Sequence, residues 1–188
     1  MKNSHCDDYL TELKQVLDDL PRERFDEIVD RLMEAYEADR QIFVIGNGGS
    51  ASTASHFACD INKGVSLGRD KKFKVICLND NIPTMLAYAN DLSYEDVFVE
   101  QLKNFLTPDD TLLALSGSGN SPNVIKAVAY ANELGACTLG LTGFEGGELG
   151  RIASTALVVP SNDMQKIEDL HMIVVHMIMQ IAQKRTAA

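Results

Sequence analysis

Five short apolar segments, separated by stretches with helical periodicity, constrain the fold of this chain more than any other feature. A strand buried on both faces needs a nearly continuous apolar run, and parallel strands need helical crossovers between them. The pattern therefore predicts an α/β fold with a doubly wound, five-stranded parallel sheet covered by helices on both faces. The predicted strands are QIFVIG (41–46), FKVICL (73–78), TLLALS (111–116), CTLGLTG (137–143) and ALVVP (156–160). The predicted helices begin at Ser50, near Pro83 and at Tyr94, and then cover 122–134, 147–153 and 164–184.

The residues before the first strand carry a different pattern. Apolar residues recur three and four positions apart up to Leu20, and the same spacing restarts after Pro21. This predicts a pair of helices over 1–40. With no internal repeat or long linker in the sequence, we expect one domain over 1–188, with an α/β core over 41–188.

Composition and charge restrict the partners and the compartment. The net charge is −10, which disfavours general binding to nucleic acid or to an anionic membrane, although a small phosphorylated ligand can still be bound locally by backbone amides. No run approaches the ~20 apolar residues of a membrane span, and the first residues do not resemble a signal peptide. The four cysteines show no CxxC spacing, so we expect reduced, mostly buried thiols and a cytoplasmic location.

Three loops rich in glycine and hydroxyl groups follow predicted strands. They are GNGGS (46–50), SGSGNSP (116–122) and TGFEGG (142–147). In open parallel sheets ligands bind beyond the carboxyl ends of the strands, where serine hydroxyls and helix-start amides can donate to phosphate oxygens. The sequence therefore predicts a phosphate site at SGSGNSP. A dinucleotide or ATP site is disfavoured, because GNGGS does not fit GxGxxG and the P-loop lysine is missing.

The helix that follows GNGGS carries His56 and Asp60, which are four residues apart and therefore share one face. Such a pair suits two ligands of one metal ion, a base beside its partner, or a purely structural contact. Lys63 follows one turn later and is interpreted either as a ligand contact or as a solvated lysine.

The last predicted helix carries Glu168, His171 and His176. Glu168 and His176 are about 12 Å apart along a straight helix, at ~1.5 Å per residue. They can share one metal only if the helix is distorted or if two chains contribute. Glu168 and His171 pair more easily within one chain, and His176 fits a packed core histidine as well as an active-site histidine.

Several blocks of the sequence, in order, resemble the SIS (sugar isomerase) domain and, within it, the phosphoheptose isomerase family. The resemblance covers nearly the whole chain, including GNGGSASTASHFACD, AYANDLSYEDVF, LLALSGSGNSPNVIKA, LGLTGFEGG and VPSNDMQKIEDLHMIVVH. It implies a flavodoxin-like, three-layer sandwich and a cytoplasmic homotetramer with active sites at subunit interfaces. It also implies conversion of sedoheptulose 7-phosphate to D-glycero-D-manno-heptose 7-phosphate, for lipopolysaccharide or capsule heptose.

Carried over by position, the resemblance assigns site residues. His56, Asp60, Glu168 and His176 match metal ligands for one Zn²⁺ per site, and Asp60, Glu168 and His176 match catalytic residues. The matching substrate-binding residues are Asn47, Gly48, Gly49, Ser50, Asp60, Asn90, Asp91, Ser116, Gly117, Ser118, Ser121 and Glu168.

Two positions depart from the family pattern. Asp60 stands where the family usually has a glutamate, and Glu168 where it usually has a glutamine. A carboxylate that is one methylene shorter moves a base by about 1 Å, which can cost on the order of 100-fold in rate unless the site is rebuilt. The second change adds a negative charge, which can strengthen a divalent-metal site.

The resemblance favours proton transfer through an enediolate, with Asp60 or Glu168 as base and His176 as acid. Two alternatives are a non-catalytic SIS protein of the type that binds the replication initiator, and a regulator that responds to a sugar phosphate. The second alternative lacks a visible DNA-binding module in this sequence.

Overall fold

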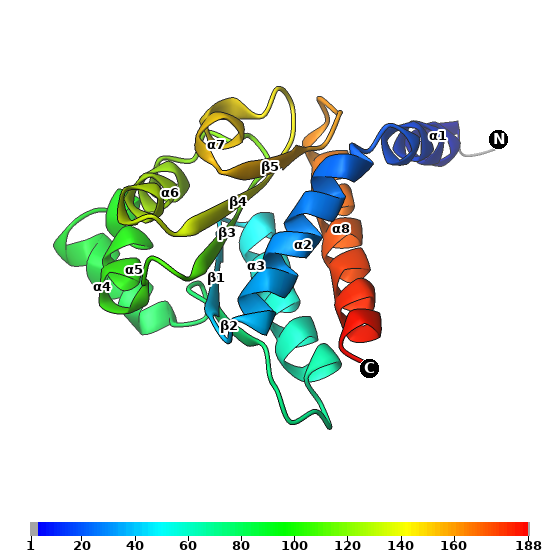
Figure 1. Ribbon diagram of the computed structural model, residues 1–188. Helices are drawn as coiled ribbons and strands as arrows, with labels where there is room; N and C mark the ends of the chain where they lie inside the picture. Colours follow the sequence, from blue (N-terminus) through cyan, green and yellow to red (C-terminus); the bar gives the residue numbers. More distant parts are fainter. Residues whose placement is uncertain (1–3, 188) are drawn as a thin grey trace.

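The computed structural model describes residues 4–187, so residues 1–3 and 188 of the predicted domain lie outside it. Its centre is a five-stranded, all-parallel sheet in the order β2-β1-β3-β4-β5. This confirms the predicted α/β, doubly wound class, and Figure 1 shows helices on both faces of the sheet. The strands are β1 (Gln41–Gly46), β2 (Lys74–Cys77), β3 (Thr111–Ser116), β4 (Cys137–Thr142) and β5 (Thr155–Val158).

Each face of the sheet is covered by its own set of helices. In Figure 1 one set lies beside the sheet on the side of α8, and the other lies on the opposite side. The first set, with the helix that precedes it, is α1 (Ser4–Asp18), α2 (Arg22–Glu37), α3 (Gly49–Cys59) and α8 (Met164–Arg185). The second set is α4 (Ile82–Asp91), α5 (Val99–Phe105), α6 (Pro122–Leu134) and α7 (Gly147–Ile152).

The central strands alternate between two apolar cores. Val44 and Leu113 face the core shared with α2, α3 and α8, whereas Phe43 and Leu112 face the core shared with α5 and α6. All four side chains are fully buried. The period of two in a strand sends neighbouring residues to opposite faces, so a strand covered on both faces needs apolar residues throughout.

Two helical segments differ from the sequence prediction. The helix expected from Tyr94 is a short 3₁₀ turn over Tyr94–Asp96, and the α-helix α5 begins only at Val99. The helix that begins at Gly49 ends as an α-helix at Cys59 and continues as a π-helical turn over Asp60–Val65. Turns of this kind are rare and often occur at functional sites.

The cysteines also differ in part from the expectation. All four are free thiols, but only Cys77 is buried, Cys137 is half-buried, and Cys6 and Cys59 are exposed. The expectation of mostly buried thiols is therefore wrong for Cys6 and Cys59. Within residues 4–187, no helix is long and apolar enough to cross a membrane.

The strand order brings the predicted loops to one edge of the sheet, where the loop after β4 also contacts the loop after β3 through the Gly143 amide, which donates to the Gly117 oxygen at 2.9 Å. From β1 the chain crosses to β2 on one side, whereas β3 pairs with β1 on the other side. Gly46 at the end of β1 is in register with Leu115 near the end of β3. The loops after β1 and β3 therefore emerge side by side at the point where the strand order reverses, the usual ligand position in open α/β sheets.

Candidate active site

The two loops enclose a pocket of about 130 Å³ that we call the serine pocket. Its hydroxyl groups come from Ser50 at the start of α3 and from Ser116, Ser118 and Ser121 after β3. Ser116 Oγ and Ser121 Oγ are 3.2 Å apart. Ser121 is the N-cap residue of α6, yet its side chain makes no capping hydrogen bond to that helix. The serine pocket is also lined by Asn47, Leu115, Gly117, Met164 and Glu168.

Two helices begin at the serine pocket. The amides in the first turn of an α-helix have no partner within the helix, and the helix dipole adds positive potential there. The start of α3 therefore offers backbone donors beside the four serines, an arrangement suited to a phosphate dianion. At the start of α6, Pro122 has no N–H and the Val124 amide donates to Asn123 Oδ1, which leaves the Asn123 amide as the donor. This is the chemistry that the sequence predicted for SGSGNSP.

The sequence reasoning missed a side-chain network that holds Asn47. Asn47 Nδ2 donates to Asn123 Oδ1 at 2.8 Å, and Asn123 Nδ2 donates back to Asn47 Oδ1 at 3.0 Å. Tyr94 Oη donates to the same Asn47 oxygen at 2.9 Å. Asn123 is buried, so its amide depends on this pairing. The only hint in the sequence is that Asn123 follows the SGSGNSP loop directly.

The second part of the site is a group of three side chains that we call the histidine cluster: His56, Asp60 and His176. His56 Nε2 lies 2.9 Å from His176 Nε2 and 3.2 Å from Asp60 Oδ2. His176 Nε2 lies 4.0 Å from the same Asp60 oxygen. The cluster joins the end of α3, where the π-helical turn begins, to the middle of α8. His56 and His176 remain 43% and 49% exposed, so a substrate or a metal ion can reach them.

Glu168 occupies a different place from the histidine cluster. α8 is one uninterrupted α-helix, so Glu168 and His176 lie two turns apart along it. Glu168 lines the serine pocket, and its carboxylate lies against Gly49, where an added Cβ would be 2.7 Å from Oε1. Within one chain the structure thus groups Glu168 with the serines of the serine pocket, and its role as a metal ligand stays a prediction.

His171, the alternative partner of Glu168, is buried behind the site. Its Nε2 lies 3.2 Å from the backbone oxygen of Thr142, and its Nδ1 has no hydrogen-bond partner among the described residues. Burial lowers the pKa of His171 to about 4, with the Thr142 contact opposing the shift. The side chain is therefore a neutral core histidine.

Acid is expected to destabilise the protein through His171. Below the unfolded pKa of about 6.5 the unfolded chain takes up a proton, whereas folded His171 stays neutral until about pH 4. Stability is thus lost as the pH falls through this window, by roughly 3 kcal/mol for this one group. Urea unfolding across this pH range, compared with His171→Gln, measures the loss. An equal pH dependence in both proteins would contradict the assignment.

The other predicted residues lie further away. Asn90 and Asp91 end α4, are exposed, and bond to each other through Asn90 Nδ2 and Asp91 Oδ1 at 2.8 Å. They are not among the described residues that line the serine pocket. Lys63 is exposed on the π-helical turn, which fits a solvated lysine as well as a contact to a large ligand. Gly48 is the N-cap residue of α3, with a φ of 54°.

The fold and the two-part site define a class of protein. The model of the SIS domain matches residues 8–143, and the chain therefore belongs to the SIS domain family.

Within this family the chain is a member of the phosphoheptose isomerase group. It is 37% identical over 175 residues to the phosphoheptose isomerase of Helicobacter pylori strain P12, covering 93% of this chain and 90% of that protein. It is 38% identical over 151 residues to the phosphoheptose isomerase of Mycobacterium bovis strain BCG Pasteur, covering 80% and 76%. The solved structure of a phosphoheptose isomerase from Francisella tularensis superimposes with a TM-score of 0.91 at 25% identity, over 98% of this chain and 99% of that one.

Proposed function

We propose that this protein is a phosphosugar aldose–ketose isomerase that converts sedoheptulose 7-phosphate to D-glycero-D-manno-heptose 7-phosphate. The observation that carries the proposal is that α3 has Ser50 of the serine pocket at its start and His56 of the histidine cluster near its end. Ser50 lies in the serine pocket, and His56 follows about 9 Å along the helix at ~1.5 Å per residue. This separation is comparable with the length of an extended seven-carbon sugar. The names of the relatives above agree with this chemistry.

Binding of the phosphate end falls to the serine pocket. Ser50, Ser116, Ser118 and Ser121 donate hydroxyl hydrogens to the phosphate oxygens, and the amides at the start of α3 add backbone donors. Glu168, in the same pocket, accepts hydrogen bonds from sugar hydroxyls and orients the chain of the substrate. The reacting carbons then point along α3 toward the histidine cluster.

Proton transfer falls to Asp60 and His176. An Asp60 carboxylate oxygen removes a proton from C1 of the ketose, and the electron pair of that C–H bond forms the enediolate. Return of a proton to C2 then gives the aldose. With its Nε2 free of metal, His176 moves a proton between the two neighbouring oxygens. The 4.0 Å between this atom and Asp60 Oδ2 is compatible with an acid and a base that act on the same part of the substrate.

The histidine cluster also fits a divalent metal ion of the zinc type. Its donor atoms lie within 4.8 Å of one another, and two imidazole nitrogens with one carboxylate form a donor set that zinc prefers. Two nitrogens on one tetrahedral zinc lie roughly 3.3 Å apart at the usual bond lengths, close to the 2.9 Å between His56 Nε2 and His176 Nε2. When bound by His56, Asp60 and His176, zinc would polarise the substrate carbonyl and stabilise the oxyanion. Because zinc would occupy the lone pair of His176 Nε2, it would replace this nitrogen in stabilising the charge on the substrate oxygens.

The exposure of the site supports a homotetramer with active sites at subunit interfaces. The side chains of His56 and His176 are each nearly half exposed to solvent, and no residue of α4, beside the site, is buried within the chain. Ile82 and Leu86 on α4 and Tyr94 beyond it are 62%, 65% and 55% exposed, an apolar surface that a second copy could cover. Such a copy could also supply Asn90, Asp91 or Glu168 to a neighbouring site. The proposed setting is the cytoplasm, with a small sugar phosphate as partner and neither nucleic acid nor membrane.

Turnover of sedoheptulose 7-phosphate, followed by NMR, tests the function. We expect formation of the aldoheptose phosphate, lost after chelation and restored by Zn²⁺. Turnover unchanged by chelation would leave His176 Nε2 free to carry its proton and would contradict the zinc proposal. Tight binding without turnover would indicate another sugar phosphate, and neither binding nor turnover would favour the non-catalytic alternative.

A further inference from the structure

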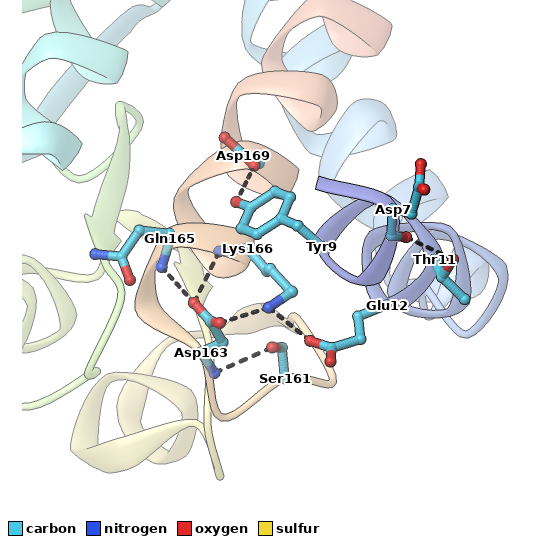
Figure 2. A network of polar contacts seen from close by, with 9 residues as sticks. All are labelled: Asp7, Tyr9, Thr11, Glu12, Ser161, Asp163, Gln165, Lys166 and Asp169. Atoms are coloured by element: carbon cyan, nitrogen blue, oxygen red, sulfur yellow. Dashed lines mark hydrogen bonds and ion pairs between the residues drawn. The ribbon is translucent and has the colours of Figure 1, made fainter. Parts of the chain in front are cut away.

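The N-terminal helix α1 contacts α8 at the same turns that line the serine pocket. Figure 2 shows Tyr9 and Glu12 of α1 facing Lys166 and Asp169 in the first two turns of α8. Tyr9 Oη donates to Asp169 Oδ2 at 2.6 Å. Glu12 Oε2 lies 2.8 Å from Lys166 Nζ. The contact thus joins a helix outside the α/β core to the start of a helix that belongs to the site.

Lys166 is the centre of this contact. Its side chain is only 6% exposed, and its ammonium group is paired with Glu12 and with Asp163. It also lies 4.6 Å from the centre of the Tyr9 ring. A lysine in the first turn of a helix is unfavourable for the helix dipole, so helix formation alone does not account for it. The ammonium group instead requires the acidic partners that surround it.

Asp163 connects Lys166 to the geometry of the helix start. It is the N-cap residue of α8, and its side chain accepts hydrogen bonds from the backbone amides of Gln165 and Lys166. The same carboxylate accepts from Lys166 Nζ. Loss of the Glu12–Lys166 pair therefore disturbs the carboxylate that caps α8.

The opposite face of the first two turns of α8 packs closely against the loops that follow β3 and β4. Met164 and Glu168 line the serine pocket. An added Cβ at Gly117 would lie 2.4 Å from Met164 Sδ, and one at Gly143 would lie 2.4 Å from Ile167 Cδ1. Because α8 packs so closely on these two loops, a shift of its first turns would move Met164 and Glu168, which line the serine pocket.

We propose that Lys166 is a positioning residue for the serine pocket. Lys166 joins Glu12 of α1 to Asp163, the N-cap residue of α8. This contact holds Met164 and Glu168 at the positions in the serine pocket that binding of the phosphate and the sugar hydroxyls requires. Tyr9 supports this position through Asp169. The expected effect on KM rests on the proposed function, whereas the expected effect on the position of α8 does not.

Kinetics with sedoheptulose 7-phosphate test the kinetic part. Glu12→Gln removes one charge from an exposed position, and we expect KM to rise roughly threefold to tenfold while kcat changes less than about twofold. Lys166→Met is expected to raise KM at least as much, and Lys166→Arg to restore part of the loss. The control is Glu27→Gln, which removes an exposed ion pair with Arg24 on α2 and should leave KM unchanged. Unchanged KM in folded Glu12→Gln and Lys166→Met would overturn the proposal.

Hydrogen exchange monitored by mass spectrometry tests the structural part without turnover. In Glu12→Gln we expect faster exchange in peptides covering 164–170 and also in 116–121, with Glu27→Gln matching the unchanged protein. Faster exchange confined to 164–170 would indicate local support of α8 only and would overturn the proposal. A protein that neither binds nor converts sedoheptulose 7-phosphate would refute the proposed function, while the exchange pattern would still decide the role of Lys166.

Discussion

Replacing Asp60 by asparagine is expected to lower kcat for sedoheptulose 7-phosphate by roughly 100-fold to 10,000-fold, the usual range for loss of a general base. Asparagine keeps the size of the side chain but cannot accept the carbon-bound proton. Asp60 is the carboxylate that contacts both histidines of the histidine cluster, at 3.2 Å and 4.0 Å. Steady-state kinetics of the purified variant, with added Zn²⁺, measures the loss.

Glu168→Gln is the matched comparison. It neutralises the carboxylate of the serine pocket and leaves the histidine cluster intact. We expect this variant to change KM more than kcat, because Glu168 lines the same pocket as the serines that we propose for phosphate binding. The reverse result, with full turnover by Asp60→Asn and a large loss of kcat in Glu168→Gln, would transfer the role of base to Glu168.

Replacing Gly119 by alanine is expected to destabilise the protein by roughly 3 kcal/mol. Gly119 has a φ of 67°, which costs an L side chain about 1 kcal/mol or more. An added Cβ would also lie 2.1 Å from the backbone oxygen of Gly146, and a backbone atom cannot swing aside as the end of a side chain can. Gly119 itself accepts the amide of Leu149 at 2.8 Å, so its movement disturbs the start of α7 as well.

Gly68→Ala separates the two causes. Gly68 has a similar φ of 74°, but an added Cβ would meet nothing within 4 Å. This control is expected to cost only about 1 kcal/mol. By thermal unfolding, Tm should fall by roughly 6–12 °C in Gly119→Ala and by roughly 2–4 °C in Gly68→Ala. Similar losses in the two variants would show that the contact with Gly146 is not the main cost.

Most of the fold was predictable because the central strands carry a strong local signal. TLLALS is buried at all six positions, so its apolar run has the same bounds as β3. Pro122 begins α6, and Gly135, with a φ of 89°, ends it, which are the usual signals for these positions. By contrast, Tyr94 begins a 3₁₀ turn in which Ser93 Oγ donates to Asp96 Oδ2, and hydrophobic periodicity does not predict such a contact between local side chains.

The site was predictable only as far as residue types and spacing allow. The serine loop and the pair His56–Asp60 each lie within one segment of the sequence. In the structure the serines of that loop line one pocket, and His56 contacts Asp60. The approach of His176 to His56 depends on how α8 packs on α3, which spacing does not give. Asn123 could not be chosen over other asparagines, because its role depends on Asn47 lying across the switch point. The sequence also gives no signal for the π-helical turn at Asp60, which packs closely against α8, since an added Cβ at Gly64 would lie 2.8 Å from Met179 Cε.

Isomerisation in D₂O is the most direct test of proton transfer between neighbouring carbons at this site. An enediolate exchanges its carbon-bound proton with the acid–base groups, and these exchange with solvent. After many forward and reverse turnovers, NMR should therefore show deuterium at C2 of the aldose and at C1 of the ketose, with little incorporation in Asp60→Asn over the same time. Full interconversion with no deuterium at either carbon, together with unchanged turnover by Asp60→Asn, would contradict proton transfer by Asp60, because the hydrogen would then pass between the carbons without this base.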